Sequence, residues 1–319
     1  MGEKMAKLLV SGLINVEMNV CVHRFPVEYT PIEYAFHQAQ ADFSGVALNV
    51  INALDSLGDA VVPVSILGND SVARTLISGF KDRNIPCGLL DCRMEQTCTS
   101  VVLFDDCGRR KIYCDLKDVQ ELVFPFESVK NEAASCDALV LCNINFNDEL
   151  IRNAKSLGKL VLTDVQDLSD IHDAYNRRFL ENADIVFLSD EKISDRHEDF
   201  LLSLYHEYKN KVIVLGQGKK GALILDSEEG TVCSVESVMT RPVVNTVGAG
   251  DALFSCFAHY YVQGKPPLDC LKKAVVFASW KIGESGGAKG FADEKHLDGL
   301  CSRIQHAVHR VCAFDPHKS

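Results

Sequence analysis

The sequence lacks any apolar run of membrane-spanning length, which requires about 20 consecutive apolar residues. It also lacks an excess of positive charge, because the formal net charge is −11 and the Lys and Arg residues are scattered. Scattered cations on an acidic chain form neither a basic patch nor a basic stripe. These absences argue against a membrane protein and against broad binding to nucleic acid or to an anionic membrane.

The 13 cysteines include no Cys-x-x-Cys pair, their number is odd, and several lie in apolar runs, as Cys136, Cys142 and Cys256 do. Buried free thiols in a reducing compartment fit this pattern better than disulfides or a zinc site. The first residues contain no apolar signal segment, and Ala6 stands where myristoylation would need Ser or Thr. We therefore expect a cytoplasmic protein.

The 319 residues, 47% of them hydrophobic, are enough for one large globular domain or for one domain and a smaller piece. From about residue 137, short apolar strands alternate with helical segments, which predicts an α/β fold with a mostly parallel central sheet between two helical layers. Ligands bind such sheets at the carboxyl ends of the strands. The predicted strands are Ala138–Cys142, Leu160–Thr163 and Ile185–Leu188, and the helices between them are Asp148–Leu157 and Ile171–Glu181.

A second group of β-rich segments predicts a small sheet outside this domain. Val16–Val22 alternates as a half-exposed strand does, and Thr97–Phe104 and Lys111–Cys114 flank the Gly-containing turn 105–108 as in a hairpin. Residues 23–41 are irregular, with two prolines and several aromatics, and they are expected to form extended segments and loops and not a helix. We therefore divide the chain into a main domain, residues 1–12, 45–95 and 118–319, and a small β lid, residues 13–44 and 96–117.

The remaining apolar periodicity predicts three more helices around the main sheet. Val46–Leu57 has helical spacing and stops at Gly58, while Leu268–Glu284 and Glu294–Val311 are expected to close the fold. His306 and His309 would share a face of the last helix. Without a third ligand nearby, we interpret both as solvated rather than metal-binding.

The stretch Asn245-Thr246-Val247-Gly248-Ala249-Gly250-Asp251 opens the segment Ala252–Val262, which is apolar almost throughout and predicts a buried helix. Free N–H groups and the positive dipole end favour an anion at such a helix start, and glycines allow it a close approach. Asp251 would then hold a hydroxyl and accept its proton as a phosphoryl group arrives. The other interpretation that the spacing allows is a helix cap preceded by a glycine turn.

Residues Gly216-Gln217-Gly218-Lys219-Lys220-Gly221 match G-x-G-x-x-G, but the strand-like run Ala222–Leu225 follows where a dinucleotide motif needs a helix. The protein-kinase motifs that would accompany a glycine loop between strands are absent, and so is the Walker A pattern. Two interpretations remain for the turn. Its backbone and Lys219 or Lys220 could face a nucleotide phosphate, or it is a simple hairpin with solvated lysines.

With both glycine-bearing stretches in view, the chain resembles the ribokinase (PfkB) family of sugar and nucleoside kinases over nearly its whole length. Residues 245–252 resemble the family's D-T-x-G-A-G-D signature, with Asn245 for the first Asp. Residues 44–49 resemble its G-G-x-x-x-N segment, with Ser44 for the first Gly, and Glu17 ends a stretch like the family's opening strand. Residues 218–221 resemble its G-x-x-G nucleotide loop.

The resemblance implies a ribokinase-like fold and ATP-dependent transfer of the γ-phosphoryl group to a hydroxymethyl group of a sugar or nucleoside. Asp251 would be the base, its pKa lowered by the helix N-terminus, and Gly248, Ala249 and Gly250 would form the anion hole. Mg²⁺, and in this family sometimes a monovalent cation such as K⁺, would assist, and the lid would exclude water and pair two subunits. ATP would contact Ser189, Gly216, Gly218, Lys219, Gly221 and Thr246. The acceptor would contact Asn15, Glu17, Ser44, Gly45, Asn49 and Arg109.

The sequence departs from the family most clearly after the strand Ile185–Leu188, where the metal-ordering N-x-x-E motif is expected but Ser189-Asp190-Glu191-Lys192 stands. We expect Asp190 or Glu191 to hold the metal through water, with direct phosphate binding by Lys192 as the alternative. Residues 164–168 resemble D-x-N-x-R with Leu168 for Arg, which argues against a sugar acid as substrate.

Two other classes of function stay open at this stage. One is a catalytically weak regulator that binds a nucleotide or a sugar on the same fold, which the altered residues 189–192 would suit. The other is a nicotinamide-dependent oxidoreductase, which rests only on the glycines at 216–221. ATP-dependent phosphate incorporation separates the first from a kinase, and an NADH absorbance assay identifies the second.

Overall fold

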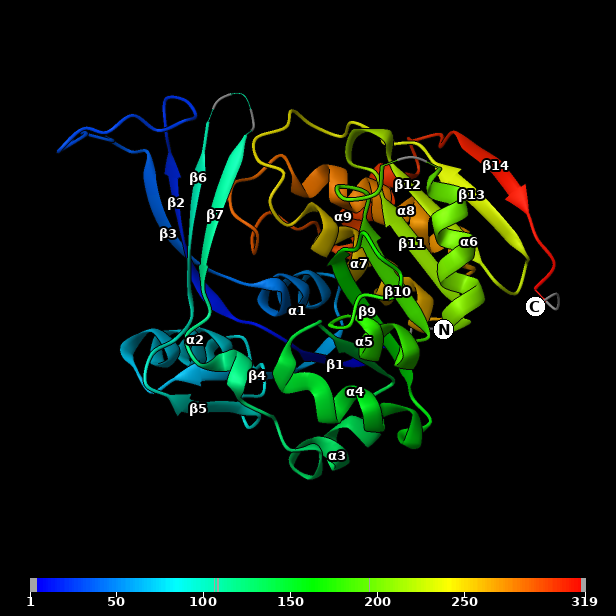
Figure 1. Ribbon diagram of the computed structural model, residues 1–319, viewed down its shortest axis with the longest axis horizontal. Coiled ribbons are helices and arrows are strands. Elements are labelled where there is room, and N and C mark those ends of the chain that lie inside the picture. Colours follow the sequence, from blue (N-terminus) through cyan, green and yellow to red (C-terminus); the bar gives the residue numbers. More distant parts are fainter. Residues whose placement is uncertain (1–4, 106, 108, 195, 317–319) are drawn as a thin grey trace.

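The structure, a computed structural model, describes residues 5–105, 107, 109–194 and 196–316. A ten-stranded sheet crosses the main body, with helices on both of its faces (Figure 1). Its strands run parallel from β5 to β11 and antiparallel from β11 to β14. In spatial order they are β14 (Val308–Ala313), β13 (Thr231–Val235), β12 (Ala222–Asp226), β11 (Val212–Gly216), β10 (Ile185–Ser189), β9 (Leu160–Asp167), β8 (Ala138–Leu141), β1 (Lys7–Ser11), β4 (Ala60–Gly68) and β5 (Leu90–Met94).

The helices form two layers, each packed on its own apolar core. One layer contains α1 (Val46–Ser56), α2 (Ser71–Asp82), α7 (Ala249–Val262), α8 (Pro267–Lys281) and α9 (Glu294–Cys301). The other contains α3 (Phe126–Ser135), α4 (Asp148–Ala154), α5 (Arg177–Asn182) and α6 (His197–Tyr208). Short 3₁₀ turns are η1 (Val119–Glu121), η2 (Asn145–Asn147), η3 (Lys155–Leu157) and η4 (Gly218–Lys220). The predicted three-layer α/β architecture is therefore confirmed.

Helix α7 is buried on all sides along its middle, as its apolar sequence predicts. Every residue from Ala252 to Tyr260 is buried, and its Phe254 and Phe257 rings pack against Phe187 on β10 at centroid distances of 4.9 and 5.2 Å. Because the middle of α7 is locked in the core, its N-terminus is held at a fixed place above the sheet. None of the helices among the described residues combines the length and the apolar character needed to cross a bilayer.

A separate four-stranded sheet stands beside the main body (Figure 1) and is made of β3 (Ala39–Ser44), β2 (Asn15–Cys21), β6 (Thr99–Phe104) and β7 (Arg110–Asp115), in that order. The predicted hairpin is confirmed, since β6 and β7 pair antiparallel; Asp106 and Gly108 of its turn lie outside the described residues. The end of residues 23–41, which were predicted to form extended segments and loops, pairs with β2 as the start of β3. The division into main domain and lid stays a prediction.

Two predicted helices are wrong in extent. Of residues 171–181, only the end is helical, as α5, because the Asp170 and Asp173 side chains accept hydrogen bonds from the backbone N–H groups of His172 and Asn176 and form turns. Of residues 294–311, α9 covers only the first eight, and the end of the stretch pairs with β13 as β14. His306 therefore lies in a connection and His309 on a strand, not on one helix face.

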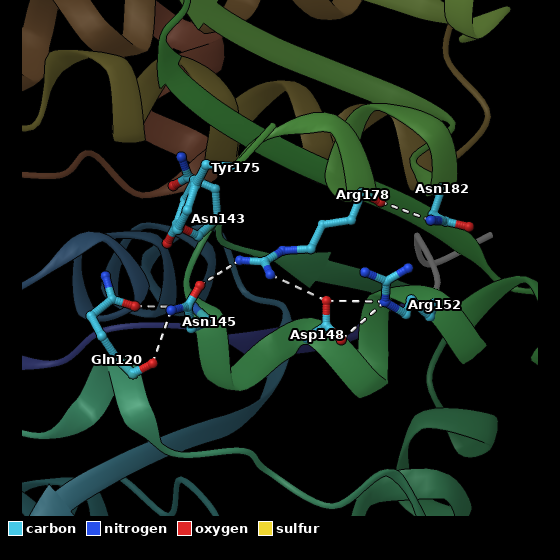
Figure 2. A network of polar contacts seen from close by, with 8 residues as sticks. All are labelled: Gln120, Asn143, Asn145, Asp148, Arg152, Tyr175, Arg178 and Asn182. Atoms are coloured by element: carbon cyan, nitrogen blue, oxygen red, sulfur yellow. Dashed lines mark hydrogen bonds and ion pairs between the residues drawn. The ribbon is translucent and has the colours of Figure 1, made fainter. Parts of the chain in front are cut away.

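A network of polar side chains braces the segments that follow β8 and β9 (Figure 2). The Arg178 guanidinium on α5 donates to Asn145 Oδ1 at 2.5 Å and to Asp148 Oδ1 at 3.2 Å, and Asp148 also binds Arg152. Beside it, the Tyr175 hydroxyl donates to the Asn143 carbonyl at 2.9 Å. The network ties α4 and α5 to the carboxyl end of β8 and thereby fixes the edge of the sheet where ligands bind.

Candidate active site

The turn before α7, which the sequence predicts to bind an anion, is shaped by a tightly packed glycine. Gly248 precedes the helix with a φ of 78°, and a Cβ there would lie 2.7 Å from the Gly287 carbonyl oxygen, so only glycine fits. The side chain of Asn245 accepts a hydrogen bond from the Val247 N–H at 2.8 Å and shapes the turn before the helix. No side chain caps the helix. Of the three predicted anion-hole residues, Ala249 uses its N–H on the Thr246 carbonyl at 3.2 Å, while Gly250 lies exposed at the helix start.

Asp251 lies in the first turn of α7 and connects this anion site to the lid side of the molecule. Its Oδ2 accepts a hydrogen bond of 2.6 Å from Asn49 Nδ2 on α1. The side chain is only partly covered, yet burial raises its pKa to about 7, and the bond from Asn49 opposes the rise. The expected lowering of the Asp251 pKa by the helix N-terminus is therefore wrong.

Three of the predicted acceptor-binding residues lie together next to Asp251. The Ser44 hydroxyl at the end of β3 is 3.4 Å from Glu17 Oε2 on β2 and 3.5 Å from Asn49 Oδ1. All three side chains are largely buried. Asn19, which the sequence did not single out, donates to the other oxygen of Glu17 at 3.0 Å. The result is a continuous row of polar groups from the small sheet to the first turn of α7.

Glycines make this close packing possible. Gly45 has a φ of 101°, and a Cβ there would lie 2.5 Å from the Leu13 carbonyl oxygen. Gly287, from the turn that follows α8, packs its backbone against Asn49 and Ser44, where a Cβ would come within 2.8 Å of the Asn49 amide. Gly287 was missed by the sequence reasoning, because its partners lie more than 200 residues earlier.

Of the other two predicted acceptor residues, Asn15 lies opposite Ser44 in the β2–β3 register, next to this row, whereas Arg109 lies apart from it. Asn15 is buried and donates to Ser100 on β6 at 2.8 Å. Arg109 lies at the turn of the β6–β7 hairpin, where it pairs with Asp105 at 2.8 Å and stacks on the Phe25 ring at 5.8 Å. None of the described contacts of Arg109 reaches Glu17 or Asn49, so the structure does not bring Arg109 together with them.

The predicted nucleotide residues lie at or just after the carboxyl ends of β10 and β11, except Thr246, which lies in the connection before α7. Ser189 and Gly216 are paired neighbours in the parallel register, and the Asp190 N–H donates to the Gly216 carbonyl at 3.1 Å. The glycine loop turns back at Gly221, whose φ of 102° and contact with the Val235 carbonyl admit no side chain. Lys219 is exposed on the turn. The loop leads into β12 and not into the helix that dinucleotide binding requires.

The altered segment 189–192 makes three charged contacts: its two carboxylates each meet a basic group, and its lysine meets a carboxylate. Asp190 Oδ2 lies 3.9 Å from His197 Nε2, Glu191 pairs with Arg110 of the small sheet at 3.4 Å, and Lys192 lies 3.5 Å from Asp167. Asp167 also accepts from the Ser189 hydroxyl at 2.8 Å. Carboxylates at this edge fit a Mg²⁺ ion that keeps its waters and is held mainly by nucleotide phosphates.

Asp164, at the carboxyl end of β9, is a buried carboxylate that the predicted site did not include. Burial raises its pKa to about 6, and a hydrogen bond of 2.8 Å from the Gln166 N–H opposes this. Its negative charge also contributes to the raised pKa of Asp251. The D-x-N-x-R-like pattern of residues 164–168 could have identified Asp164 as a site residue. The sequence interpretation used only the Leu168 position of that pattern.

The three-layer α/β fold with a separate small sheet, together with the family pattern and the relatives given below, shows a phosphotransferase that uses an alcohol group as acceptor. The chain belongs to the pfkB family of carbohydrate kinases, whose pattern matches residues 5–294.

Relatives agree with this assignment. A ribokinase from Dictyostelium discoideum is 22% identical over 293 residues, which cover 81% of this chain and 89% of that protein. A microbiome-derived acarbose kinase superposes with a TM-score of 0.85 at 21% identity, over 94% of this chain and 100% of that one. Ribokinase from Arabidopsis thaliana, solved with ribose and ATP, gives a TM-score of 0.80 at 19% identity over 95% and 100%. At these identities the structural likeness establishes the fold.

Proposed function

We propose that this protein transfers the γ-phosphoryl group of ATP to a hydroxymethyl group of a sugar or nucleoside. The observation that carries the proposal is the 2.6 Å hydrogen bond between Asn49 and Asp251. This hydrogen bond joins Asn49, one of the residues that we propose bind hydroxyl groups, to Asp251, at the helix N-terminus that we propose binds phosphate. A group that must touch both reactants at once belongs at that junction.

In the proposed reaction the acceptor oxygen forms a bond to the γ-phosphorus as the bond from that phosphorus to the β-γ bridging oxygen breaks. ADP leaves, and the acceptor proton passes to Asp251. The transition state of such transfers is loose, so stabilisation of charge matters more than activation of the nucleophile. The N–H groups at the start of α7, from Gly250 in particular, would donate to the transferring oxygens. An Asp251 pKa of about 7 suits a base that works near neutral pH.

The nucleotide would lie over the carboxyl ends of β10 and β11, with its phosphates directed toward α7. Ser189, the glycine loop 216–221 and Thr246 would line it, and Lys219 would reach it from the turn. A bound Mg²⁺ would supply positive charge that neutralises part of the phosphate charge. Asp190 and Asp167 would hold the water shell of this Mg²⁺. We propose a monovalent cation such as K⁺ as an additional cofactor.

A sugar is the acceptor that the relatives favour, since they are named as ribokinases and as kinases of acarbose. Glu17, Ser44 and Asn49 supply one carboxylate, one hydroxyl and one amide, a set that matches vicinal hydroxyl groups. Leu168 stands where an arginine would bind a carboxylate, so we propose a neutral sugar. We also propose that two subunits pair through the small sheet.

The test is a screen of aldoses, ketoses and nucleosides with ATP and Mg²⁺, with the product identified by ³¹P NMR. Asp251→Asn keeps the shape of the side chain and should lower kcat by about 10² or more, as loss of a proton-transfer group does. ATP affinity, measured by calorimetry, should stay within about twofold, since the change leaves the phosphate donors in place. Near-normal turnover in this variant would remove Asp251 from the mechanism.

A regulator with little catalytic activity is the second candidate, favoured by the basic partners of Glu191 and Asp190, which compete with a metal for their charge. It predicts tight binding of a nucleotide or a sugar without phosphate incorporation. Binding by calorimetry together with an empty ³¹P product spectrum for every acceptor in the screen would support it over the kinase.

A further inference from the structure

Lys281, the last residue of α8, has a completely buried side chain with 0% of its surface exposed. It is the single lysine found in the core of the described part of the chain. Lysines are rarely buried without a compensating charge, because removing an ammonium from water is unfavourable. Its ammonium donates a hydrogen bond to the Gly286 carbonyl, a neutral acceptor that cannot offset this cost alone.

The turn that Lys281 binds lies directly beneath the candidate active site. Gly286, with a φ of 77°, and Gly287 form this turn after α8. The backbone of Gly287 lies against Gly248 on one side and against the Asn49 amide on the other. A shift of the turn would therefore move the anion site and the hydrogen bond partner of Asp251 together.

The end of α8 does not need Lys281 as a cap. Arg241 already donates from Nε to the Trp280 carbonyl at 2.6 Å, and its guanidinium stacks on the Trp280 ring at 4.1 Å. One further donor to Gly286 could be supplied by a neutral side chain at a lower desolvation cost. The charged groups around Lys281 therefore have to account for the buried charge at this position.

Those groups are mostly carboxylates. Burial lowers the Lys281 pKa to about 8, and the negative charges of Asp251, Glu284 and Glu17 oppose the lowering, while Arg241 adds to it. In the other direction, Lys281 lowers the pKa of Asp251, against the increases that burial, Asp164 and Glu17 cause. Without Lys281, the Asp251 carboxylate would lie among groups of like charge. The hydrogen bond from Asn49 would then be left to stabilise its ionised form.

We propose that Lys281 is a positioning residue for the phosphoryl transfer: its buried ammonium is the counter-charge that keeps Asp251 ionised and ready to accept the proton. The same ammonium holds the turn after α8 against the anion site. This inference rests on the proposed function for its catalytic meaning, but the coupling between the two charges can be measured without any turnover. The pair should titrate as a unit, so the pH profile of kcat/KM should be bell-shaped.

The first experiment compares Lys281→Met, which keeps length and removes charge, with Lys272→Met on the outer face of the same helix. Aspartates labelled with ¹³C at the carboxyl are titrated by NMR, and the Asp251 signal is identified by its absence in Asp251→Asn. The Asp251 midpoint should rise by about one pH unit or more in Lys281→Met, a tenfold change in proton affinity, and stay put in Lys272→Met. The acidic limb of kcat/KM should move up by the same amount.

The second experiment is reciprocal and survives a failure of Lys281→Met to fold. Coupling between two sites acts equally in both directions, so Asp251→Asn should lower the titration midpoint of the Lys281 ¹³Cε signal by the same amount. An unmoved Lys281 midpoint in Asp251→Asn overturns the proposal, as does an unmoved Asp251 midpoint in folded Lys281→Met. A reciprocal shift in a protein that phosphorylates no acceptor would instead retain the charge pair and reject the proposed function.

Discussion

The pKa of Asp251 is decided by two physical effects of different size, the helix dipole and burial. A helix N-terminus stabilises a carboxylate by about 0.3–1 kcal/mol, which is less than one pKa unit. Burial raises a carboxylate pKa by up to several units, and here it prevails over both the dipole and the Asn49 hydrogen bond. The sequence revealed the dipole, because it is local, but not the burial, which depends on residues from α1, β9 and the turn after α8.

Glu17 should bind the acceptor rather than take part in the chemistry. Glu17→Gln keeps the shape but removes the charge, and hydrogen bonds to charged groups contribute about 1.5–3 kcal/mol. We therefore expect the acceptor KM to rise by about tenfold to a hundredfold, with a smaller change in kcat. Steady-state kinetics would show this split, and Glu28→Gln on an exposed part of the chain is the control. An unchanged KM for every accepted substrate would refute the role.

His259 on α7 should make the stability of the protein depend on pH. The buried imidazole lies 2.8 Å from Asp59 and 3.4 Å from Glu294. Burial lowers its pKa, but the hydrogen bond and charge of Asp59 prevail, and the net pKa is raised. A raised folded-state pKa gives stability that is full below the unfolded value of about 6.5 and is lost as the pH rises through the folded value.

His259→Gln should accordingly cost about 3 kcal/mol of unfolding free energy at pH 6, as loss of one partner of a buried pair does. The cost should be smaller at pH 9 than at pH 6, because the wild-type imidazole loses its charge as the pH rises through its raised folded-state pKa. Urea unfolding at both pH values measures the difference, with His296→Gln as the control. Equal costs at pH 6 and pH 9 would show that His259 is buried in its neutral form throughout.

At the scale of elements, the sequence predicted what local periodicity determines. The strands near 138, 160 and 185 and the buried helix α7 follow directly from apolar runs and a glycine stop. The strands β13 and β14 did not, because β14 is the edge strand, β13 lies next to it, and the half-exposed pattern of each is no stronger than that of an amphipathic helix. Likewise the row of Glu17, Ser44 and Asn49 was predicted from motifs, whereas Lys281 and Gly287 reach the site only through the tertiary fold.

The segment after β10 should set the magnesium requirement. Asp190 is partly buried, and its N–H binds the strand that leads into the glycine loop, while Glu191 points outward to Arg110. Asp190→Asn should raise the Mg²⁺ concentration for half-maximal activity several-fold with little change in the acceptor KM, since hydrated Mg²⁺ is held by few carboxylates. Glu191→Gln is the matched neighbour and should have the smaller effect.

Titration of activity with Mg²⁺ at saturating ATP separates this account from direct phosphate binding by Lys192. If both acidic variants keep the wild-type Mg²⁺ requirement and Lys192→Met weakens ATP binding, the lysine replaces part of the metal's charge. Lys192 lies 3.5 Å from Asp167, so such a role would require that ion pair to open when ATP binds.

At the scale of the whole molecule, the main body has helices on both faces of its sheet, whereas the small sheet stands beside it as a separate element. The ten-stranded sheet is covered on both faces by helices that enclose two apolar cores (Figure 1). The contacts of the small sheet with the main body include the Ser44–Asn49 contact and, at the surface, the ion pairs Arg110–Glu191 and Lys289–Asp42. Surface ion pairs contribute little, about 0–1 kcal/mol each, so they can open and close with the acceptor.

The segment between β2 and β3 leaves large apolar side chains in water. Tyr34 and Phe36 are each 77% exposed, and their rings stack on one another at 5.9 Å. Tyr29 and Ile32 are exposed on the same segment, and Ile112 and Tyr113 are exposed on β7. Such a concentration of exposed apolar surface in a monomer marks an interface, which supports the proposed pairing of two subunits through the small sheet.

Light scattering coupled to size exclusion should therefore find a dimer of the wild-type chain, and Tyr34→Ser combined with Phe36→Ser should shift it to a monomer. Stable pairs bury about 800 Å² per partner around a few aromatic anchors, so loss of two anchors should weaken association by about a hundredfold or more. Met239→Ser removes an exposed apolar side chain from the main body, at 82% exposure, and should leave the dimer intact. A wild-type chain that stays monomeric at high micromolar concentration would reject pairing through the small sheet. A double variant that is monomeric but fully active would show that pairing is not needed for the site to close.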